Sequence, residues 1–183
     1  IEQIMNNIDI STPAGFRNRT ILELLYATGM RISELCSLTF KSLNLDNDEI
    51  TVFGKGQKER IVLVSKRAKG YLTDYLNTAR VLVAKGFEVQ STSDAPVFIN
   101  NTGYKLQPQT VRTVLKKIME NLELPKNVTP HKFRHSFATH LIQNGADLLA
   151  IQMLLGHKSI NTTEIYTHIS MENLRNTITE FHP

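Results

Sequence analysis

Two short runs of β-branched residues, joined by a glycine-containing loop, limit what this chain can fold into more than any other feature. The runs are Ile50–Phe53 and Arg60–Val64, and the segment between them, Gly54–Glu59, contains two glycines. This pattern is typical of a β-hairpin with a six-residue loop. We expect a third strand at Pro96–Ile99, followed by a turn at Asn100–Gly103. The sheet should therefore be small and antiparallel.

Most of the remaining chain has the apolar spacing of helices. Ser11–Pro13 is a helix start, residues 16–28 carry an apolar stripe, and Gly29 is placed to end that helix. Further helices are expected at residues 31–38, 67–84, 108–122, 131–144, 147–155, 159–167 and 171–180. The expected fold is mainly α with a small antiparallel β-sheet (α+β). A chain of 183 residues is long enough for one domain with a real core, and we expect a single domain over residues 1–183.

The positive charge of the chain is small but uneven. Lys and Arg number 21 against 17 acidic residues, a net charge of +4 that does not by itself argue for a nucleic-acid partner. Residues 31–70 hold 8 basic and 5 acidic side chains, and residues 111–140 hold 6 basic and 2 acidic ones. Ordinary solvated faces would also explain this distribution.

Targeting signals and membrane segments are not visible in the sequence. No apolar run approaches the ~20 residues that a membrane helix needs, and no signal peptide precedes the first helix. Cys36, with Leu35 and Leu38 beside it, is expected to be a core residue in a reducing cytoplasm. Because the chain begins with Ile1 rather than Met, we expect it to be a fragment of a longer protein.

His131 and Arg134 are the first pair of residues that suggest chemistry. They are three residues apart on an expected helix and so share a face. Thr129 and Pro130 precede them, which puts the pair on the first turn, where the helix dipole and free N–H groups favour an anion. A guanidinium can bind a phosphate through two parallel hydrogen bonds, and a histidine can move a proton. The alternative is a helix start with solvent-facing polar residues.

Four more residues are candidates, although each has an ordinary structural explanation on its own. Arg31 opens a short helix directly after Gly29 and could be a surface residue, and Glu34, three residues on, could pair with it or orient it for a ligand. The other three are a lysine at the hairpin tip, a histidine that could cap a helix, and a tyrosine that could pack against the core. These are Lys55, His157 and Tyr166.

Taken together, these residues fall in blocks that resemble the tyrosine recombinase family of phage-integrase type, and its Xer-like bacterial members most closely. The blocks occur in the family's order and spacing from about residue 15 to residue 175. They are Ala27–Leu35, Gly54–Arg60, Thr129–His140, Leu154–Ser159 and Thr162–His168.

The resemblance implies a site-specific DNA recombinase that breaks and rejoins double-stranded DNA. Arg31 and Arg134 would bind the two non-bridging oxygens of the scissile phosphate. Tyr166 would attack phosphorus to give a covalent 3′-phosphotyrosine and a free 5′-hydroxyl, so that rejoining needs no ATP. His131 would be the general base and Lys55 the acid for the leaving 5′-oxygen, and His157 would support the phosphate and the tyrosine. No metal and no other cofactor is implied.

The resemblance and the local charge also suggest contacts with the DNA backbone. Lys58, Arg60, Lys132 and Lys158 are expected to contact phosphates, which would position the duplex without reading its sequence. His135 and His140 are expected to be structural or supporting residues, and no role is assigned to His168.

Full-length relatives carry an N-terminal helical domain that closes around the other side of the duplex, and we expect that domain to be absent from this chain. We therefore expect this fragment to bind DNA weakly, with salt-sensitive affinity, and to recombine poorly alone. Residues 171–183, with Leu174 and Ile178 as an apolar edge, could pack on a neighbouring subunit, as the tetramer of full-length relatives on DNA would require, or fold back on their own domain.

Two other functions remain open on the sequence. One is relaxation of DNA strands in the manner of a type IB topoisomerase, and the other is DNA binding without activity. We expect a cytoplasmic bacterial protein without a membrane partner. It would either resolve chromosome dimers or be the integrase of a mobile genetic element.

Overall fold

The computed structural model describes residues 1–54, 59–87, 92–123, 128–156 and 171–182. In chain order its elements are α1 (Glu2–Asn6), α2 (Pro13–Thr28), α3 (Ile32–Cys36), β1 (Leu43–Asn44), β2 (Glu49–Phe53), β3 (Glu59–Leu63), α4 (Lys66–Asn77), α5 (Ala79–Lys85), α6 (Pro108–Asn121), α7 (Pro130–Gln143), α8 (Leu148–Leu155) and α9 (Met171–Phe181). The expectation of a mainly helical chain with a small antiparallel sheet is confirmed.

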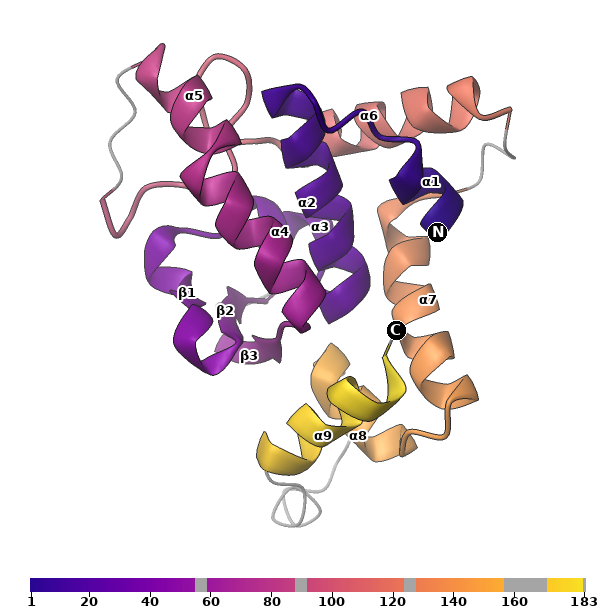
Figure 1. Cartoon of the computed structure of the whole chain (residues 1–183). Helices are drawn as coiled ribbons and strands as arrows, with labels where there is room; N and C mark the ends of the chain where they lie inside the picture. The colour runs from indigo at the N-terminus through magenta and orange to yellow at the C-terminus, as the bar shows by residue number, and fades with distance from the viewer. Residues whose placement is uncertain (55–58, 88–91, 124–127, 157–170, 183) are drawn as a thin grey trace.

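Helix α2 is the central element, with α4 and α5 on one side and α7 on the other (Figure 1). The hydroxyl of Thr12 accepts a hydrogen bond from the Gly15 amide at 3.0 Å, and Pro13 opens the first turn. Gly29 ends the helix in the left-handed conformation, as the sequence predicted. Because it is covered on several sides, α2 buries nearly all of its second half, from Arg19 to Thr28.

The sheet has the order β1-β2-β3 and is antiparallel throughout. Thr51 lies opposite Ile61 and Phe53 opposite Glu59, which confirms the predicted hairpin. The prediction of a strand at Pro96–Ile99 is wrong, because the main chain there makes only isolated β-bridges. The third strand is instead the two-residue β1, which has no strand-like pattern in the sequence.

The main-chain groups of residues 96–99 have partners in several different elements, and for that reason they do not join the sheet. Val97 donates from its amide to the carbonyl of Leu38 at 2.9 Å. The guanidinium of Arg80 donates to the carbonyls of Pro96 and Val97 at 2.9 and 3.1 Å. The segment is thus a buried connector rather than a strand.

One long helix was expected over residues 67–84, but two helices, α4 and α5, meet at Thr78. The backbone of Thr78 is far from helical, with φ −120° and ψ −84°. The break turns α5 so that Arg80 can satisfy the carbonyls of Pro96 and Val97 while its side chain stays buried. A tertiary contact therefore overrides the continuous helical pattern.

The hydrophobic core has two parts. The larger cluster joins α2, the sheet and the inner faces of α4 and α6, and it includes Cys36, which is buried as expected. Burial raises the pKa of the Cys36 thiol to about 11, despite the nearby charges of Lys105 and Arg112. The smaller cluster packs α7, α8 and α9 against Leu63 of β3. Among the described residues, no helix is long and apolar enough to cross a membrane.

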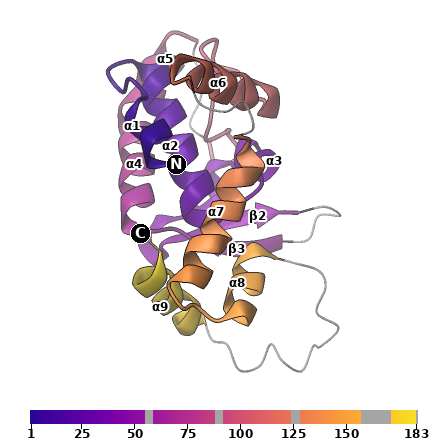
Figure 2. The ribbon, with the colours of Figure 1, turned by 90° about the vertical axis from the view of Figure 1, so that its right-hand side faces the viewer.

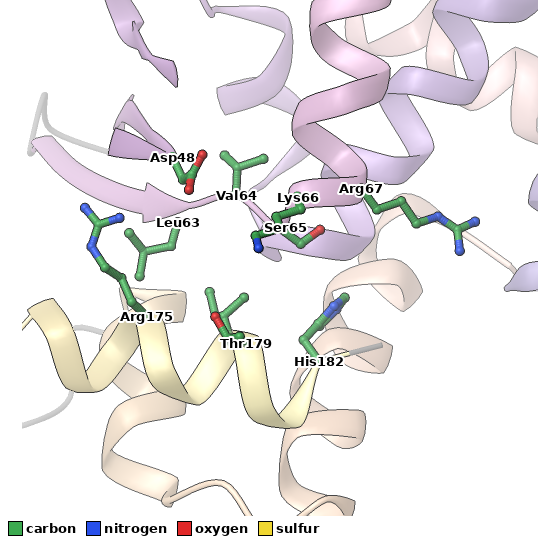
Figure 3. A pocket seen from close by; sticks show the side chains of 10 residues that line it. Asp48, Leu63, Val64, Ser65, Lys66, Arg67, Arg175, Thr179 and His182 are labelled. Carbon is green, nitrogen blue, oxygen red and sulfur yellow. The ribbon is translucent and has the colours of Figure 1, made fainter. Parts of the chain in front are cut away.

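Helix α9 packs on its own domain through Leu174 and Ile178, which belong to the smaller cluster. Arg175 extends this contact by donating to Glu49 Oε1 at 2.6 Å and to the carbonyl of Asn47 at 2.5 Å. Next to these contacts, a cavity of about 360 Å³ lies between α9 on one side and the end of β3 and the start of α4 on the other (Figure 3). Leu63 and Ile178 belong to the smaller cluster and also line this cavity.

Candidate active site

Arg31 is held at the turn between α2 and α3 by the conformation of Gly29. The backbone of Gly29 has φ +59°, and a Cβ on it would lie 2.7 Å from Phe137 and 2.8 Å from Leu155. Glycine is therefore required both for the turn and for the approach of α7 and α8. As a result, Arg31 begins α3 directly beside the N-terminal half of α7.

Glu34 fixes Arg31 through two hydrogen bonds. Its Oε2 accepts from the main-chain amide of Arg31 at 2.7 Å, and its Oε1 accepts from Arg31 Nη1 at 3.0 Å. The carboxylate is buried, with 2% of the side chain exposed, whereas the Arg31 side chain is 48% exposed. The pairing predicted from the three-residue spacing is confirmed, and it leaves much of the guanidinium of Arg31 open to solvent.

Arg60 has a partner that the sequence did not indicate. Its Nη1 and Nη2 donate to Glu34 Oε1 and Oε2 at 2.7 and 2.9 Å, a two-pronged ion pair. Its side chain is 16% exposed. The expectation for Arg60 was a DNA phosphate contact, but here its two terminal nitrogens are bonded to a buried carboxylate.

The two arginines decide the charge of Glu34. Burial raises the pKa of this carboxyl, but the hydrogen bonds and charge of Arg60, together with the main-chain and side-chain bonds of Arg31, outweigh that effect. The net result lowers the pKa of Glu34 from 4.5 to about 2. Glu34 is thus ionised at neutral pH and balances part of the positive charge around it.

The guanidinium of Arg134 is hydrogen-bonded to the C-terminal ends of two helices, α2 and α8. Its Nη1 donates to the carbonyl of Gly29 at 2.5 Å and its Nη2 to the carbonyl of Leu155 at 2.6 Å. Burial, followed by the positive charges of Arg31 and Arg60, lowers the pKa of Arg134 to about 10. The guanidinium therefore stays charged at neutral pH in a position fixed by two carbonyls.

His131 is exposed on the first turn of α7, where the sequence placed it with Arg134. A cavity of about 260 Å³ brings His131, Arg134 and Arg31 together. The other residues that line it are Met30, Ile32, Ser33, Arg112, Thr129 and Pro130. The structure thus brings together three of the six predicted catalytic residues, from two elements about 100 residues apart.

Arg112 is a lining residue that the sequence reasoning missed. It is exposed on α6, where its Nη1 donates a long hydrogen bond to Gln109 Oε1 at 3.5 Å. A lone arginine on the polar face of an amphipathic helix has no pattern that marks it. The only signal was the basic window of residues 111–140, to which Arg112 belongs.

The other predicted site residues that the structure describes do not line this cavity. Lys132 is exposed next to His131, and His135 is exposed on α7. His140 is hydrogen-bonded through Nδ1 to the hydroxyl of Tyr26, which agrees with a structural role. Five predicted residues lie outside the described residues: Lys55, Lys58, His157, Lys158 and Tyr166.

The elements that precede those five residues in the chain, β2 and α8, lie on the same side of the molecule as α3 and the start of α7. Figure 2 shows α3, the start of α7, the Phe53–Glu59 end of the hairpin and α8 along one side. Gly156, which ends α8, contacts the stem of Arg60 so closely that a Cβ on it would lie 2.6 Å from Arg60 Cδ. Arg60 thereby links the hairpin, Glu34 and the end of α8.

The arrangement is suited to binding a tetrahedral anion. Arg31, Arg112 and Arg134 line one small cavity, which His131 also borders. Guanidinium groups provide paired, directional N–H donors for phosphate oxygens. An exposed imidazole beside them can donate a hydrogen bond or transfer a proton.

Comparisons with known proteins agree with this chemistry. A model described as the phage integrase family matches residues 1–173. The tyrosine recombinase XerC of Bacillus pumilus (strain SAFR-032) is 45% identical over 184 residues, which cover 100% of this chain and 59% of that protein. The tyrosine recombinase XerD of Staphylococcus epidermidis (strain ATCC 35984) is 44% identical over 180 residues, covering 98% of this chain and 59% of that protein.

Solved structures give the same result for the fold. The crystal structure of XerA recombinase superposes with a TM-score of 0.71 at 32% identity, covering 100% of this chain and 64% of that one. XerH site-specific recombinase bound to palindromic difH substrate, a post-cleavage complex, superposes with a TM-score of 0.70 at 30% identity, covering 97% of this chain and 49% of that one. The chain thus spans about three fifths of the length of the curated relatives it matches.

Proposed function

The chain belongs to the phage integrase family, and on that premise we propose that it is the catalytic domain of a site-specific DNA recombinase. In this proposal it breaks and rejoins double-stranded DNA through a covalent 3′-phosphotyrosine, without ATP or a metal ion. The observation that carries the proposal is the single cavity lined by Arg31, His131 and Arg134. Residues 1–183 would form one catalytic domain.

The two arginines would bind the non-bridging oxygens of the scissile phosphate. A guanidinium has five N–H donors. Arg134 uses one from each terminal nitrogen on the carbonyls of Gly29 and Leu155, which leaves others for a phosphate. Arg31 is fixed at one edge by Glu34 and half exposed at the other. Donors held in place before the reaction stabilise the charge that develops on phosphorus oxygens in the transition state.

Proton transfer would be shared among three residues around the phosphate. A phenol with a pKa of about 10 needs help to lose its proton near neutral pH, and His131, exposed at the cavity, is the proposed base for Tyr166. Lys55, which lies between β2 and β3 in the sequence, would protonate the leaving 5′-oxygen. His157, which follows Gly156, would support the phosphate and the tyrosine.

Backbone phosphates on either side of the cleaved bond would contact a wider ring of basic residues. Lys132 and Arg112 are exposed beside the cavity, which supports this role for them. Lys58 and Lys158 are proposed on their place in the sequence alone. Such contacts position the duplex and make binding salt-dependent.

Double-stranded DNA is therefore the proposed partner, and the DNA-bound form of XerH is consistent with it. We also propose that copies of the longer protein assemble on DNA as a homo-oligomer in a bacterial cytoplasm. Residues 171–183 could then exchange between subunits in place of the contacts that α9 makes within its own domain. Cross-linking at low and high protein concentration, with the protein bound to DNA, would detect that exchange.

Strand exchange tests the proposed function. Duplexes that the protein retains from a randomised pool would be labelled differently at their ends, mixed in pairs and incubated with the chain. A recombinase produces duplexes that carry one label from each parent, whereas relaxation of a supercoiled plasmid without label exchange would indicate a topoisomerase. DNA retention with neither reaction and with no covalent protein–DNA adduct on a nicked duplex would indicate a binding module.

A further inference from the structure

We infer that Arg60 is a positioning residue for the phosphate site: it holds Glu34 and thereby fixes the direction in which Arg31 presents its guanidinium. The inference rests on the proposed function, because it gives Arg60 a part in the same phosphate chemistry. It replaces the expectation that Arg60 contacts the DNA backbone. Arg60 would act through Arg31 and would not touch the substrate.

The hydrogen bonds around Glu34 are shared evenly between the two arginines. Oε1 accepts from Arg60 Nη1 at 2.7 Å and from Arg31 Nη1 at 3.0 Å. Oε2 accepts from Arg60 Nη2 at 2.9 Å and from the Arg31 amide at 2.7 Å. Each carboxylate oxygen thus binds both residues, so the plane of the Glu34 carboxylate cannot rotate without breaking bonds to both.

Burial separates the roles of the two arginines. Glu34 is 2% exposed, Arg60 16% and Arg31 48%. The Arg60–Glu34 pair is therefore the buried part of this three-residue ion-pair network. Arg31 is its solvent-exposed part and lines the cavity. A two-pronged pair restricts both side chains more than a single contact does, so Arg60 is the anchor and Arg31 the group that meets the ligand.

The remaining nitrogen of Arg60 also argues against a phosphate contact. Its Nε is buried and has no hydrogen-bond partner among the described residues. The end of α8 lies directly against this part of the side chain, since a Cβ on Gly156 would be 2.9 Å from Nε. Glu34 takes one N–H of each terminal nitrogen and Gly156 covers the Nε side, so only the outer N–H of each terminal nitrogen is left for a phosphate.

Arg60 therefore connects three parts of the proposed site. It arises from β3 of the hairpin, binds the Glu34 of α3, and is covered by the residue that ends α8. Removing the guanidinium should leave a buried carboxylate held by Arg31 alone. We expect Arg31 to turn inward toward Glu34 and away from the cavity, because an ionised buried group takes whatever donor remains.

The test separates positioning from DNA contact by measuring binding and cleavage in the same variants. The substrate is a duplex with a nick at the centre of a randomised sequence, on which cleavage near the nick traps the covalent protein–DNA adduct. The variants are Arg60→Gln, Arg60→Lys, Glu34→Gln and the double variant Arg60→Gln/Glu34→Gln. Arg67→Gln is the matched control, because Arg67 also pairs with a buried carboxylate, Glu23, at 3.0 Å.

We expect Arg60→Gln to form adduct roughly 10- to 100-fold more slowly, because Arg31 is misplaced. DNA affinity and its salt dependence in Arg60→Gln should match those of Glu34→Gln, since both variants misplace Arg31, whereas Arg67→Gln should match the wild type. The double variant should be no slower than Glu34→Gln alone, since Arg60 acts only through Glu34. Arg60→Lys should fall between wild type and Arg60→Gln, because a lysine restores the charge but not the paired bonds.

The opposite pattern would overturn the inference. A backbone contact by Arg60 itself predicts that Arg60→Gln lowers the slope of log affinity against log salt by about one even in the Glu34→Gln background, so that the effects of the two substitutions add. Thermal melting shows whether each variant is folded, and if Arg60→Gln is unfolded, Arg60→Lys is compared with Glu34→Gln by the same two measurements.

A measurement that needs no reaction distinguishes failure of this inference from failure of the proposed function. The side-chain ¹⁵N signals of Arg31 in DNA-free protein should shift in Arg60→Gln relative to wild type and Arg67→Gln, because the guanidinium takes a different position. If wild type forms no adduct, the proposed function fails, while the signals still decide whether Arg60 orders Arg31. Unchanged Arg31 signals together with unchanged cleavage would rule out a positioning role.

Discussion

The guanidinium of Arg134 donates a 2.6 Å hydrogen bond to the main-chain carbonyl of Leu155. Its other terminal nitrogen is bonded to the carbonyl of Gly29, so one side chain ties the end of α8 to the end of α2. These are the helix ends that lead to His157 and to Arg31. Arg134 thus has a structural task in addition to its proposed role at the phosphate.

Arg134→Lys should therefore lose both stability and activity. A single ammonium cannot bind two carbonyls and a phosphate with the geometry of a guanidinium. We expect a loss of about 1–3 kcal/mol in the free energy of unfolding and a fall of roughly 100-fold or more in adduct formation. Urea unfolding and adduct rates on nicked duplexes measure the two effects. Wild-type activity in Arg134→Lys would contradict the assignment.

Gly29→Ala should destabilise the protein because both its backbone and its surroundings exclude a side chain. The φ of Gly29 is +59°, and a Cβ would lie 2.7 Å from Phe137 and 2.8 Å from Leu155. We expect a loss of about 2 kcal/mol or more in the free energy of unfolding.

Gly70→Ala is the matched control for that substitution. Gly70 lies inside α4, and a Cβ there would have nothing within 4 Å. We expect this variant to gain about 0.5–1 kcal/mol in the free energy of unfolding. Equal effects of the two substitutions in urea unfolding would show that the Gly29 turn is not required.

Glu34 should contribute a pH dependence to stability at acid pH. Its pKa is lowered from 4.5 to about 2 in the folded chain, so ionised Glu34 stabilises the fold above pH 4.5, and this contribution is lost as the pH falls toward 2. The shift corresponds to at most about 3 kcal/mol. Glu34→Gln lacks this contribution, so its free energy of unfolding should fall less than that of the wild type as the pH is lowered from 4.5 toward 2. Parallel curves of unfolding free energy against pH for the two proteins would contradict the paired state of Glu34.

Arg112→Ala should weaken DNA binding without preference for sequence. If Arg112 contacts a backbone phosphate beside the cavity, the slope of log affinity against log salt should decrease by about one. Arg67→Ala removes an arginine that lines a different cavity and should leave the slope unchanged. Filter binding at several salt concentrations measures both. Identical slopes for Arg112→Ala and wild type would place Arg112 outside the DNA contact.

Local signals predicted the parts of the fold and site that depend on neighbouring residues. Thr12, Pro13 and Gly29 mark the ends of α2 because capping is a property of adjacent residues. The Arg31–Glu34 pair followed from helical spacing in the same way. The shared cavity of Arg31 and Arg134 followed only from the family resemblance, since no local rule joins residues about 100 positions apart.

The errors arose where distant contacts decide the structure. Arg80 binds the carbonyls of Pro96 and Val97, which both breaks the helix expected at 67–84 and removes 96–99 from the sheet. Likewise, Arg60 lies 26 residues from Glu34, so no local pattern indicated their ion pair. Charge indicates that an arginine has an anionic partner but does not identify that partner.

The most direct test of the central claim is whether Tyr166 forms the covalent bond to DNA. Wild type and Tyr166→Phe would be incubated with the nicked duplex pool, and denaturing gels would separate free protein from protein–DNA adduct. We predict an adduct with a free 5′-hydroxyl on the released strand for wild type, and none for Tyr166→Phe, because phenylalanine lacks the attacking oxygen. An adduct of equal yield in Tyr166→Phe would contradict the proposed chemistry.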